Sequence, residues 1–104
     1  MINYKMILQY DGSRYSGWQV QGNTEQTIQG KLQSVLEKMT GEEIEIHGSG
    51  RTDAGVHAMG QVANFKLQSA YEPEEIKRYC NQYLPEDVAV ISCQEAAPRF
   101  HARL

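Results

Sequence analysis

The residues with the clearest chemical potential lie in one glycine-rich segment, Gly48–Ala58, between two strand-like patterns. Its glycines favour backbone conformations that side chains would forbid. Within it, Asp53 follows Arg51 by two residues. A carboxylate beside a guanidinium stays ionised and can act as a nucleophile or base, and the guanidinium can bind a phosphate or a nucleobase. The same pattern also fits a tight turn in which the carboxylate caps its own backbone, and the spacing leaves both interpretations open.

A second irregular segment, residues 11–21, combines a cation, the only tryptophan and several polar side chains. Its notable members are Arg14, Trp18 and Gln19. Aromatic rings interleaved with cations and amides suit single-stranded or loop RNA, whose unstacked bases expose their faces and edges. The alternative is a glycine-rich loop whose tryptophan packs against the core.

Other chemistries have little support in the sequence. The three histidines, His47, His57 and His101, lack the spacing of metal ligands, so no metal site is expected. The two cysteines, Cys80 and Cys93, have no CxxC spacing, and Cys80 falls at a core position. There is no phosphate-binding glycine motif, apolar span or signal-peptide pattern. We therefore expect a cytoplasmic protein that does not bind a membrane.

The chain has 104 residues and a formal charge of −3, which fits one small acidic domain. This balance argues against capture of nucleic acid by overall charge. Most of the glutamates lie within Glu37–Glu45 and Glu72–Glu86, whereas several arginines lie in loop or terminal segments. The uneven distribution leaves room for local RNA binding.

Hydrophobic periodicity predicts the elements that must position these residues. Alternation over Ile2–Tyr10 indicates a half-buried strand, with Tyr4 and Tyr10 on its apolar side. An apolar stripe from Ile28 to Met39 indicates a helix, capped by Asn23 or Thr24 and ended by Gly41. Further strands are predicted at residues 44–47, 62–67 and 87–93, and a second helix begins at Pro73 and ends before Pro85.

The inner face of this second helix is predicted to hold five residues: Ile76, Tyr79, Cys80, Tyr83 and Leu84. The resulting order is β-α-β-β-α-β. This order predicts an α+β fold of the ferredoxin-like split type, an antiparallel sheet with both helices on one face.

Ordered motifs along nearly the whole chain, from about Ile2 to Arg103, resemble the TruA family of tRNA pseudouridine synthases. The motifs are Tyr10-Asp11-Gly12-Ser13-x-Tyr15-x-Gly17-Trp18-Gln19-x-Gln21, Thr27-x-Gln29, Gly50-Arg51-Thr52-Asp53-Ala54-Gly55-Val56-His57-Ala58, Leu84-Pro85 and Phe100-His101-Ala102-Arg103. The run around Asp53 is highly specific.

The resemblance implies isomerisation of uridine to pseudouridine in the tRNA anticodon stem-loop, without metal or organic cofactor. It implies that Asp53 is the catalytic aspartate and that Arg51 helps to hold the target nucleotide out of its stack. The residues expected to contact RNA, or to support such contacts structurally, are Arg14, Trp18, Gln19, His57, Arg99, His101 and Arg103.

Members of this family are longer than this chain. We therefore expect residues 1–104 to form the N-terminal domain of a TruA-like enzyme, inactive without the C-terminal half and homodimeric at full length. A non-catalytic RNA-binding module on a ferredoxin-like sheet is the alternative. It would need strand aromatics that face solvent, which Tyr4 and Tyr10 are not expected to do.

Overall fold

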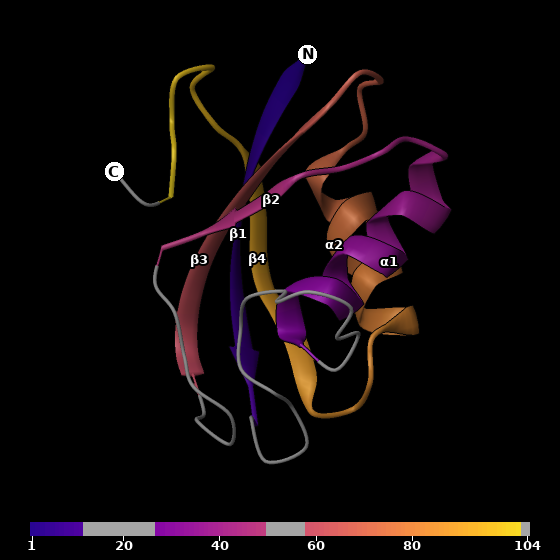
Figure 1. Ribbon diagram of the computed structural model, residues 1–104, viewed down its shortest axis with the longest axis vertical. Coiled ribbons are helices and arrows are strands. Elements are labelled where there is room, and N and C mark those ends of the chain that lie inside the picture. The colour runs from indigo at the N-terminus through magenta and orange to yellow at the C-terminus, as the bar shows by residue number, and fades with distance from the viewer. Residues whose placement is uncertain (12–26, 50–57, 103–104) are drawn as a thin grey trace.

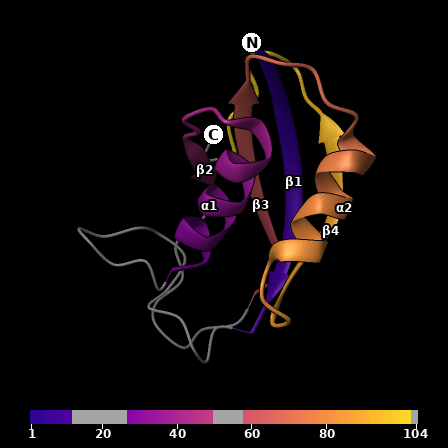
Figure 2. The ribbon, with the colours of Figure 1, turned by 90° about the vertical axis from the view of Figure 1, so that its right-hand side faces the viewer.

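The computed structural model describes residues 1–11, 27–49 and 58–102 (Figure 1). The elements are β1 (Ile2–Tyr10), α1 (Ile28–Thr40), β2 (Ile46–Gly48), β3 (Ala58–Leu67), α2 (Pro73–Tyr83) and β4 (Val88–Glu95). Both helices lie on the same side of the sheet, as Figure 2 shows. The predicted ferredoxin-like order and α+β class are therefore confirmed.

The sheet is built around β1. The strand order is β2-β3-β1-β4, and every neighbouring pair is antiparallel. At its end, β1 places Tyr10 opposite Ala58 on one side and Val88 on the other. The alternating residues of β1 give it one apolar face, which packs under the helices.

The core lies between this face and the two helices. Its members are buried apolar side chains from every element, among them Tyr4, Met6, Leu8, Ile28, Leu32, Leu36, Ile46, Phe65, Ile76, Cys80 and Val90. The Tyr4 ring stacks on Phe65, with centroids 5.7 Å apart. Its hydroxyl donates to the Tyr71 carbonyl oxygen at 2.8 Å and accepts from the Tyr71 amide at 2.9 Å. Burial of this polar group is thereby compensated.

The start of α1 differs from the prediction. The N-cap is Thr27, rather than Asn23 or Thr24, and its hydroxyl accepts from the Gly30 amide at 3.1 Å. A cap at this position satisfies one of the amides that the first helical turn leaves unpaired. The predicted end is confirmed, because Gly41 has a φ of 72° in the left-handed region that favours glycine.

The strand boundaries also shift. The second strand was expected at residues 44–47 but β2 begins at Ile46, because the Ile44 amide donates to a Glu37 carboxylate oxygen at 3.0 Å. The third strand is longer than expected, because β3 pairs with β1 from Ala58 onward. Likewise, β4 continues to Glu95, which lies opposite Tyr4.

The prediction for the inner face of α2 is wrong at Tyr83. Ile76, Cys80 and Leu84 follow one another at four-residue intervals and are buried, whereas Tyr83 is 57% exposed. Tyr79 and Tyr83 form a separate stripe beside this one, with ring centroids 4.6 Å apart. Neither helix of the described residues has the length and hydropathy needed to cross a membrane.

Both cysteine thiols lie in the layer between α2 and β4. Cys80 is fully buried, which confirms its core position, and Cys93 is half-buried. Burial raises the pKa of Cys80 from 9.0 to about 12, with a smaller contribution from Cys93. Burial also raises the pKa of Cys93 from 9.0 to about 12, with a smaller contribution from Glu74. Since the thiolate is the reactive form, both groups are inert at neutral pH.

We predict that the folded protein reacts with a thiol-specific disulfide reagent at pH 8 on the order of 1000-fold more slowly than the unfolded chain, because each pKa unit changes the thiolate fraction tenfold. The measurement is the rate of thiol modification with and without denaturant. Because the raised pKa favours the protonated thiol, the associated stability is present below pH 9 and is lost as the pH rises toward 12. Equal rates in the two states would contradict this account.

We also predict that Thr27→Ala lowers the free energy of unfolding by about 1 kcal/mol, because the Gly30 amide loses its acceptor. Thr27→Ser retains the hydroxyl and is the matched control. Urea unfolding should separate the two variants, with Thr27→Ser closer to the wild type. If both variants unfold at the same urea concentration, the cap hydrogen bond does not stabilise α1.

Candidate functional site

The segment that contains Asp53 is attached to the sheet at both of its ends. At the first end, the Ser49 amide donates to the Val62 carbonyl oxygen at 2.8 Å, and the Val62 amide donates to the Ser49 hydroxyl at 3.4 Å. At the second end, Ala58 begins β3 opposite Tyr10. The structure thus fixes the two points between which residues 50–57 connect β2 to β3.

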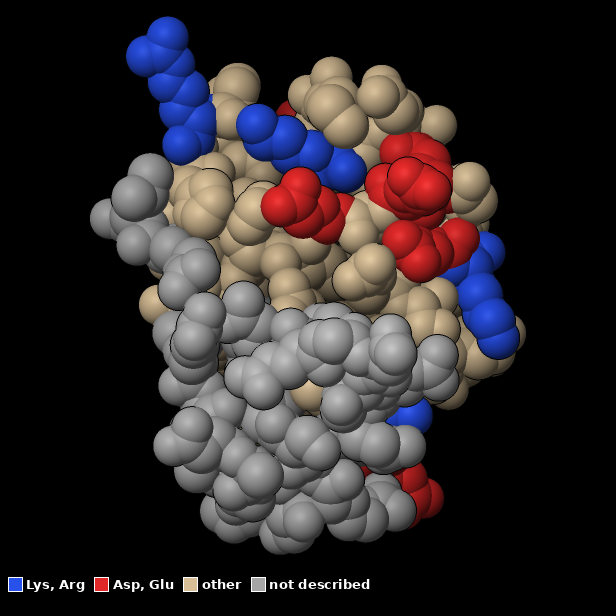
Figure 3. Space-filling model, in the orientation of Figure 1, with Lys and Arg blue, Asp and Glu red and all other residues tan. Residues whose placement is uncertain are grey.

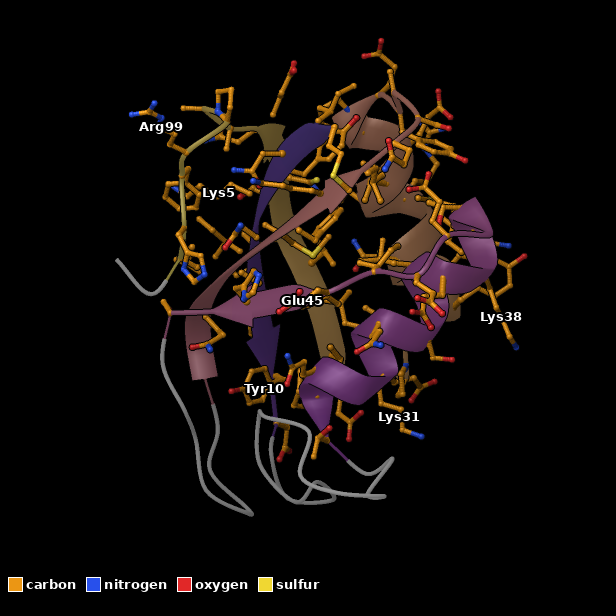
Figure 4. All side chains as sticks on the ribbon, turned by 45° about the horizontal axis from the view of Figure 1, so that its top comes forward. Lys5, Tyr10, Lys31, Lys38, Glu45 and Arg99 are labelled. Atoms are coloured by element: carbon orange, nitrogen blue, oxygen red, sulfur yellow. The ribbon has the colours of Figure 1, made fainter. Side chains whose placement is uncertain are left out.

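The other motif segment, residues 12–26, is attached near the same end of the sheet. The Asp11 amide donates to the Asp87 carbonyl oxygen at 2.9 Å, directly after β1. At the far side of the segment, Thr27 opens α1, which begins toward this end (Figure 2). Figure 4 labels Tyr10, the last residue of β1, at this end of the sheet.

Gln29 connects the attachments of the two segments to each other. Its side-chain amide, in the first turn of α1, donates to the Ile46 carbonyl oxygen of β2 at 2.6 Å. This bond joins the helix that follows residues 12–26 to the strand that precedes residues 50–57. The sequence analysis gave the Thr27-x-Gln29 motif no role. In the structure, Thr27 caps α1 and Gln29 joins α1 to β2 by a hydrogen bond.

Most of the sequence-predicted site residues lie outside the described residues. They are Arg14, Trp18, Gln19, Arg51, Asp53, His57 and Arg103. Their roles stay predictions, as do those of Arg99 and His101, whose positions the structure describes.

His101 lies beside the edge strand of the sheet. Its ring centroid is 4.3 Å from that of His47 in β2, two residues before Ser49. The Nε2 atom of His47 is in turn 3.7 Å from a carboxylate oxygen of the exposed Glu45. Thus His101 lies near the strand that leads into residues 50–57.

Arg99, by contrast, lies away from this region. It is exposed, and Figure 4 shows it extending from the opposite end of the sheet to Tyr10. The structure therefore brings His101, but not Arg99, toward the attachments of the Asp53 segment.

A C-terminal strap, residues 96–102, crosses the face of the sheet opposite the helices, visible at the left of Figure 1. Two buried asparagines hold it: the Asn3 side chain donates to the carbonyl oxygens of Ala97 at 2.8 Å and Phe100 at 2.9 Å. Asn64 donates to the Asn3 side-chain oxygen at 3.2 Å and accepts from the Ala102 amide at 2.9 Å. All these polar groups are satisfied by the strap and by each other.

The sequence analysis did not identify these asparagines as functional residues. Asn3 and Asn64 alternate with the core residues of β1 and β3 and so fall on the other, more polar face, yet they are only 2% and 1% exposed. The strap covers them and supplies their partners. The available signal was the residue type, because asparagine is disfavoured within strands and two of them here occupy one face.

The described residues give no support to an RNA-binding sheet face of aromatic side chains. Tyr4 and Tyr10 are 1% and 3% exposed and belong to the core. Among residues 1–11, 27–49 and 58–102, no three histidine, cysteine or acidic side chains gather in a way that could hold a metal ion.

Comparison with known proteins identifies relatives along nearly the whole of this chain. The family described as tRNA pseudouridine synthase matches residues 6–103. A protein named tRNA pseudouridine synthase A from Bacillus sp. (strain KSM-64) is 57% identical over 103 residues, which cover 99% of this chain and 42% of that protein. Relatives with related names from Clostridium tetani and Maridesulfovibrio salexigens are 50% and 43% identical, again over 99% of this chain, which covers 42% and 38% of their lengths.

The chain belongs to the tRNA pseudouridine synthase family. It spans about two-fifths of the length of these curated relatives, as the 42% coverage shows.

We predict that Asn64→Ala detaches the strap, because the Ala102 amide loses its acceptor and Asn3 loses a donor. Unsatisfied buried groups of this kind should lower the free energy of unfolding by about 2 kcal/mol. The specific readout is hydrogen exchange of the Ala102 amide, which should become faster. Asn81→Ala is the matched control, since Asn81 makes two backbone hydrogen bonds to Val90 instead. Unchanged exchange at Ala102 in the Asn64 variant would show that the strap is held by other contacts.

Proposed function

We propose that this protein is the part of a tRNA pseudouridine synthase that carries the catalytic aspartate. The observation that carries the proposal is the family match over residues 6–103, which includes the whole Asp53 segment. The names of the relatives, tRNA pseudouridine synthase A, support uridine in tRNA as the substrate. The attachment of residues 12–26 and 50–57 near one end of the sheet supports a common site.

In the proposed reaction, Asp53 acts on a uridine that has been flipped out of its stack. The bond between the sugar and the ring nitrogen breaks, the uracil turns, and a bond from the sugar to a ring carbon forms. That carbon loses a proton and the nitrogen gains one, so the product has the same composition as the substrate. No oxidant, reductant or group donor is consumed, which is consistent with a reaction that depends on side chains alone.

Arg51 has a positioning role in this proposal. A planar guanidinium can bind a phosphate or stack on a base, and either contact would hold the target nucleotide out of the helix. Extrusion costs a few kcal/mol and costs least where a base is poorly paired or stacked. This supports the anticodon stem-loop as the target. In the same proposal, RNA contacts come from Arg14, Trp18, Gln19 and His57, together with the strap residues Arg99 and His101 and the adjoining Arg103.

The proposal also concerns the rest of the enzyme. Because the chain covers 42% of its Bacillus relative, we infer that it forms the N-terminal domain and needs the C-terminal half for turnover. The complete protein is proposed to be a cytoplasmic homodimer. A suitable test protein is a chimera, in which this chain replaces the matching part of that relative.

We predict that Asp53→Asn in the chimera lowers turnover by on the order of 1000-fold or more, as loss of a central catalytic group does in other enzymes. The assay is tritium release from tRNA that carries labelled uridine, and tRNA binding is measured in parallel and should persist. Glu45→Gln makes the same carboxylate-to-amide change at an exposed residue directly before β2 and should leave the rate unchanged. Substantial turnover by the Asp53 variant would remove this residue from its proposed role.

A further inference from the structure

A hollow of about 400 Å³ lies between the outer sides of the two helices. We call it the helix groove. It is lined by Lys31, Ser34, Val35 and Lys38 from α1, Tyr79 and Tyr83 from α2, and Pro85 beyond it. Figure 2 looks onto this side of the molecule, with α1 and α2 lying next to each other in front of the sheet. The groove is separate from the strap, which crosses the other face.

The aromatic side of the groove is available for stacking. Tyr83 is 57% exposed, the most exposed aromatic side chain that the structure describes. Its ring packs against Tyr79 at a centroid distance of 4.6 Å, so it is supported from one side. A supported, exposed aromatic ring offers a stacking surface for a nucleobase at little cost in side-chain entropy.

The cationic side of the groove comes from α1. Lys31 and Lys38 are two helical turns apart, about 10 Å along the axis. This separation equals three steps of a stacked nucleic-acid strand at about 3.4 Å each. Figure 4 shows both side chains extending from the outer side of α1. Within the described part of the chain, neither ammonium group forms an ion pair, so both remain available to phosphates.

We propose that the helix groove binds a single-stranded or loop segment of the RNA substrate. In this arrangement, phosphates lie along Lys31 and Lys38 while a base stacks on Tyr83. The combination favours RNA over an acidic peptide, because a peptide would satisfy the cations but leave the exposed ring without a matching planar group.

The position of the groove fits an RNA that also reaches the motif segments. Lys31 donates its backbone amide to the Thr27 carbonyl oxygen, so it lies in the turn that directly follows residues 12–26. Pro85 precedes Asp87 by two residues, and the Asp87 carbonyl accepts from Asp11 at the end of β1. The inference rests on the proposed function for the identity of the RNA, but not on the role of Asp53.

The first test measures binding of unmodified tRNA to the chimera by fluorescence anisotropy at several salt concentrations. Loss of two phosphate contacts in the double variant Lys31→Gln/Lys38→Gln should weaken binding. It should also reduce the slope of log K against log salt by about 1.4 to 1.8. The matched control is Lys66→Gln/Lys77→Gln, which removes the same charge from positions outside the groove lining. An equal effect of the control would overturn the proposal, because it would show that only net charge matters.

The second test separates stacking from charge. Tyr83→Ala should raise Kd on the order of 5-fold or more, as loss of one base–aromatic stack does, whereas Tyr83→Phe should bind like the wild type. Circular dichroism verifies that these exposed-site variants remain folded. Unchanged tRNA affinity in both the lysine variant and the Tyr83→Ala variant would overturn the groove proposal. A change in oligomeric state without a change in tRNA affinity would also overturn it, because it would assign the groove to a protein contact.

The two proposals fail in distinguishable ways. If Asp53→Asn retains turnover, the catalytic assignment is wrong, while the binding measurements on the groove variants keep their meaning. If the groove variants bind tRNA normally but Asp53→Asn is inactive, the groove proposal is wrong and the proposed function stands.

Discussion

The fold depends on the double pairing of β1, which pairs with β3 from Ile2 to Tyr10 and with β4 from Tyr4 to Tyr10. A shift of either pairing by one residue would turn Tyr4, Met6 and the other core residues of β1 to the wrong face. The buried face therefore fixes the register. Together with one irregularity in each pairing near Leu8, this register places Ala58 and Val88 on either side of Tyr10. The points where residues 12–26 and 50–57 join the sheet therefore depend on the pairing of β1. Packing under the helices, rather than any local preference of the loops, decides where the candidate site is attached.

The sequence predicted the order, number and sidedness of the elements, because periodicity reports which face of each element is buried. Two of the misplaced boundaries lie where a side chain forms a hydrogen bond with a backbone amide. Glu37 takes the Ile44 amide away from the sheet, and Thr27 caps α1 after the positions that sequence favoured. Tyr83 was misplaced for a different reason. An apolar residue at a helical interval can lie beside the core stripe as readily as within it, and only the packing of α1 against α2 decides between them.

Candidate residues could be named from the sequence where they form a continuous motif, and not where they come from distant parts of the chain. Arg51 and Asp53 stand out because an unusual loop composition surrounds them. Asn3 and Asn64 do not, because their burial depends on a strap whose residues lie at the other end of the sequence: the Asn3 contact with the Phe100 carbonyl spans 97 residues. Alternation describes which face a strand residue occupies, but it carries no information on what later covers that face.

A net charge of −3 and binding to a polyanion are compatible when the relevant charges are local. At physiological salt the screening length is about 8 Å, so carboxylates farther away on the surface weaken a phosphate contact only slightly. Figure 3 shows acidic side chains gathered over one part of the face in view, with basic side chains directly beside them and elsewhere on the same face. An acidic domain of this kind gains little from long-range steering. In the groove proposal, its contribution to RNA affinity comes from short-range contacts, in which two cations and a stacked ring act together once the substrate is already close.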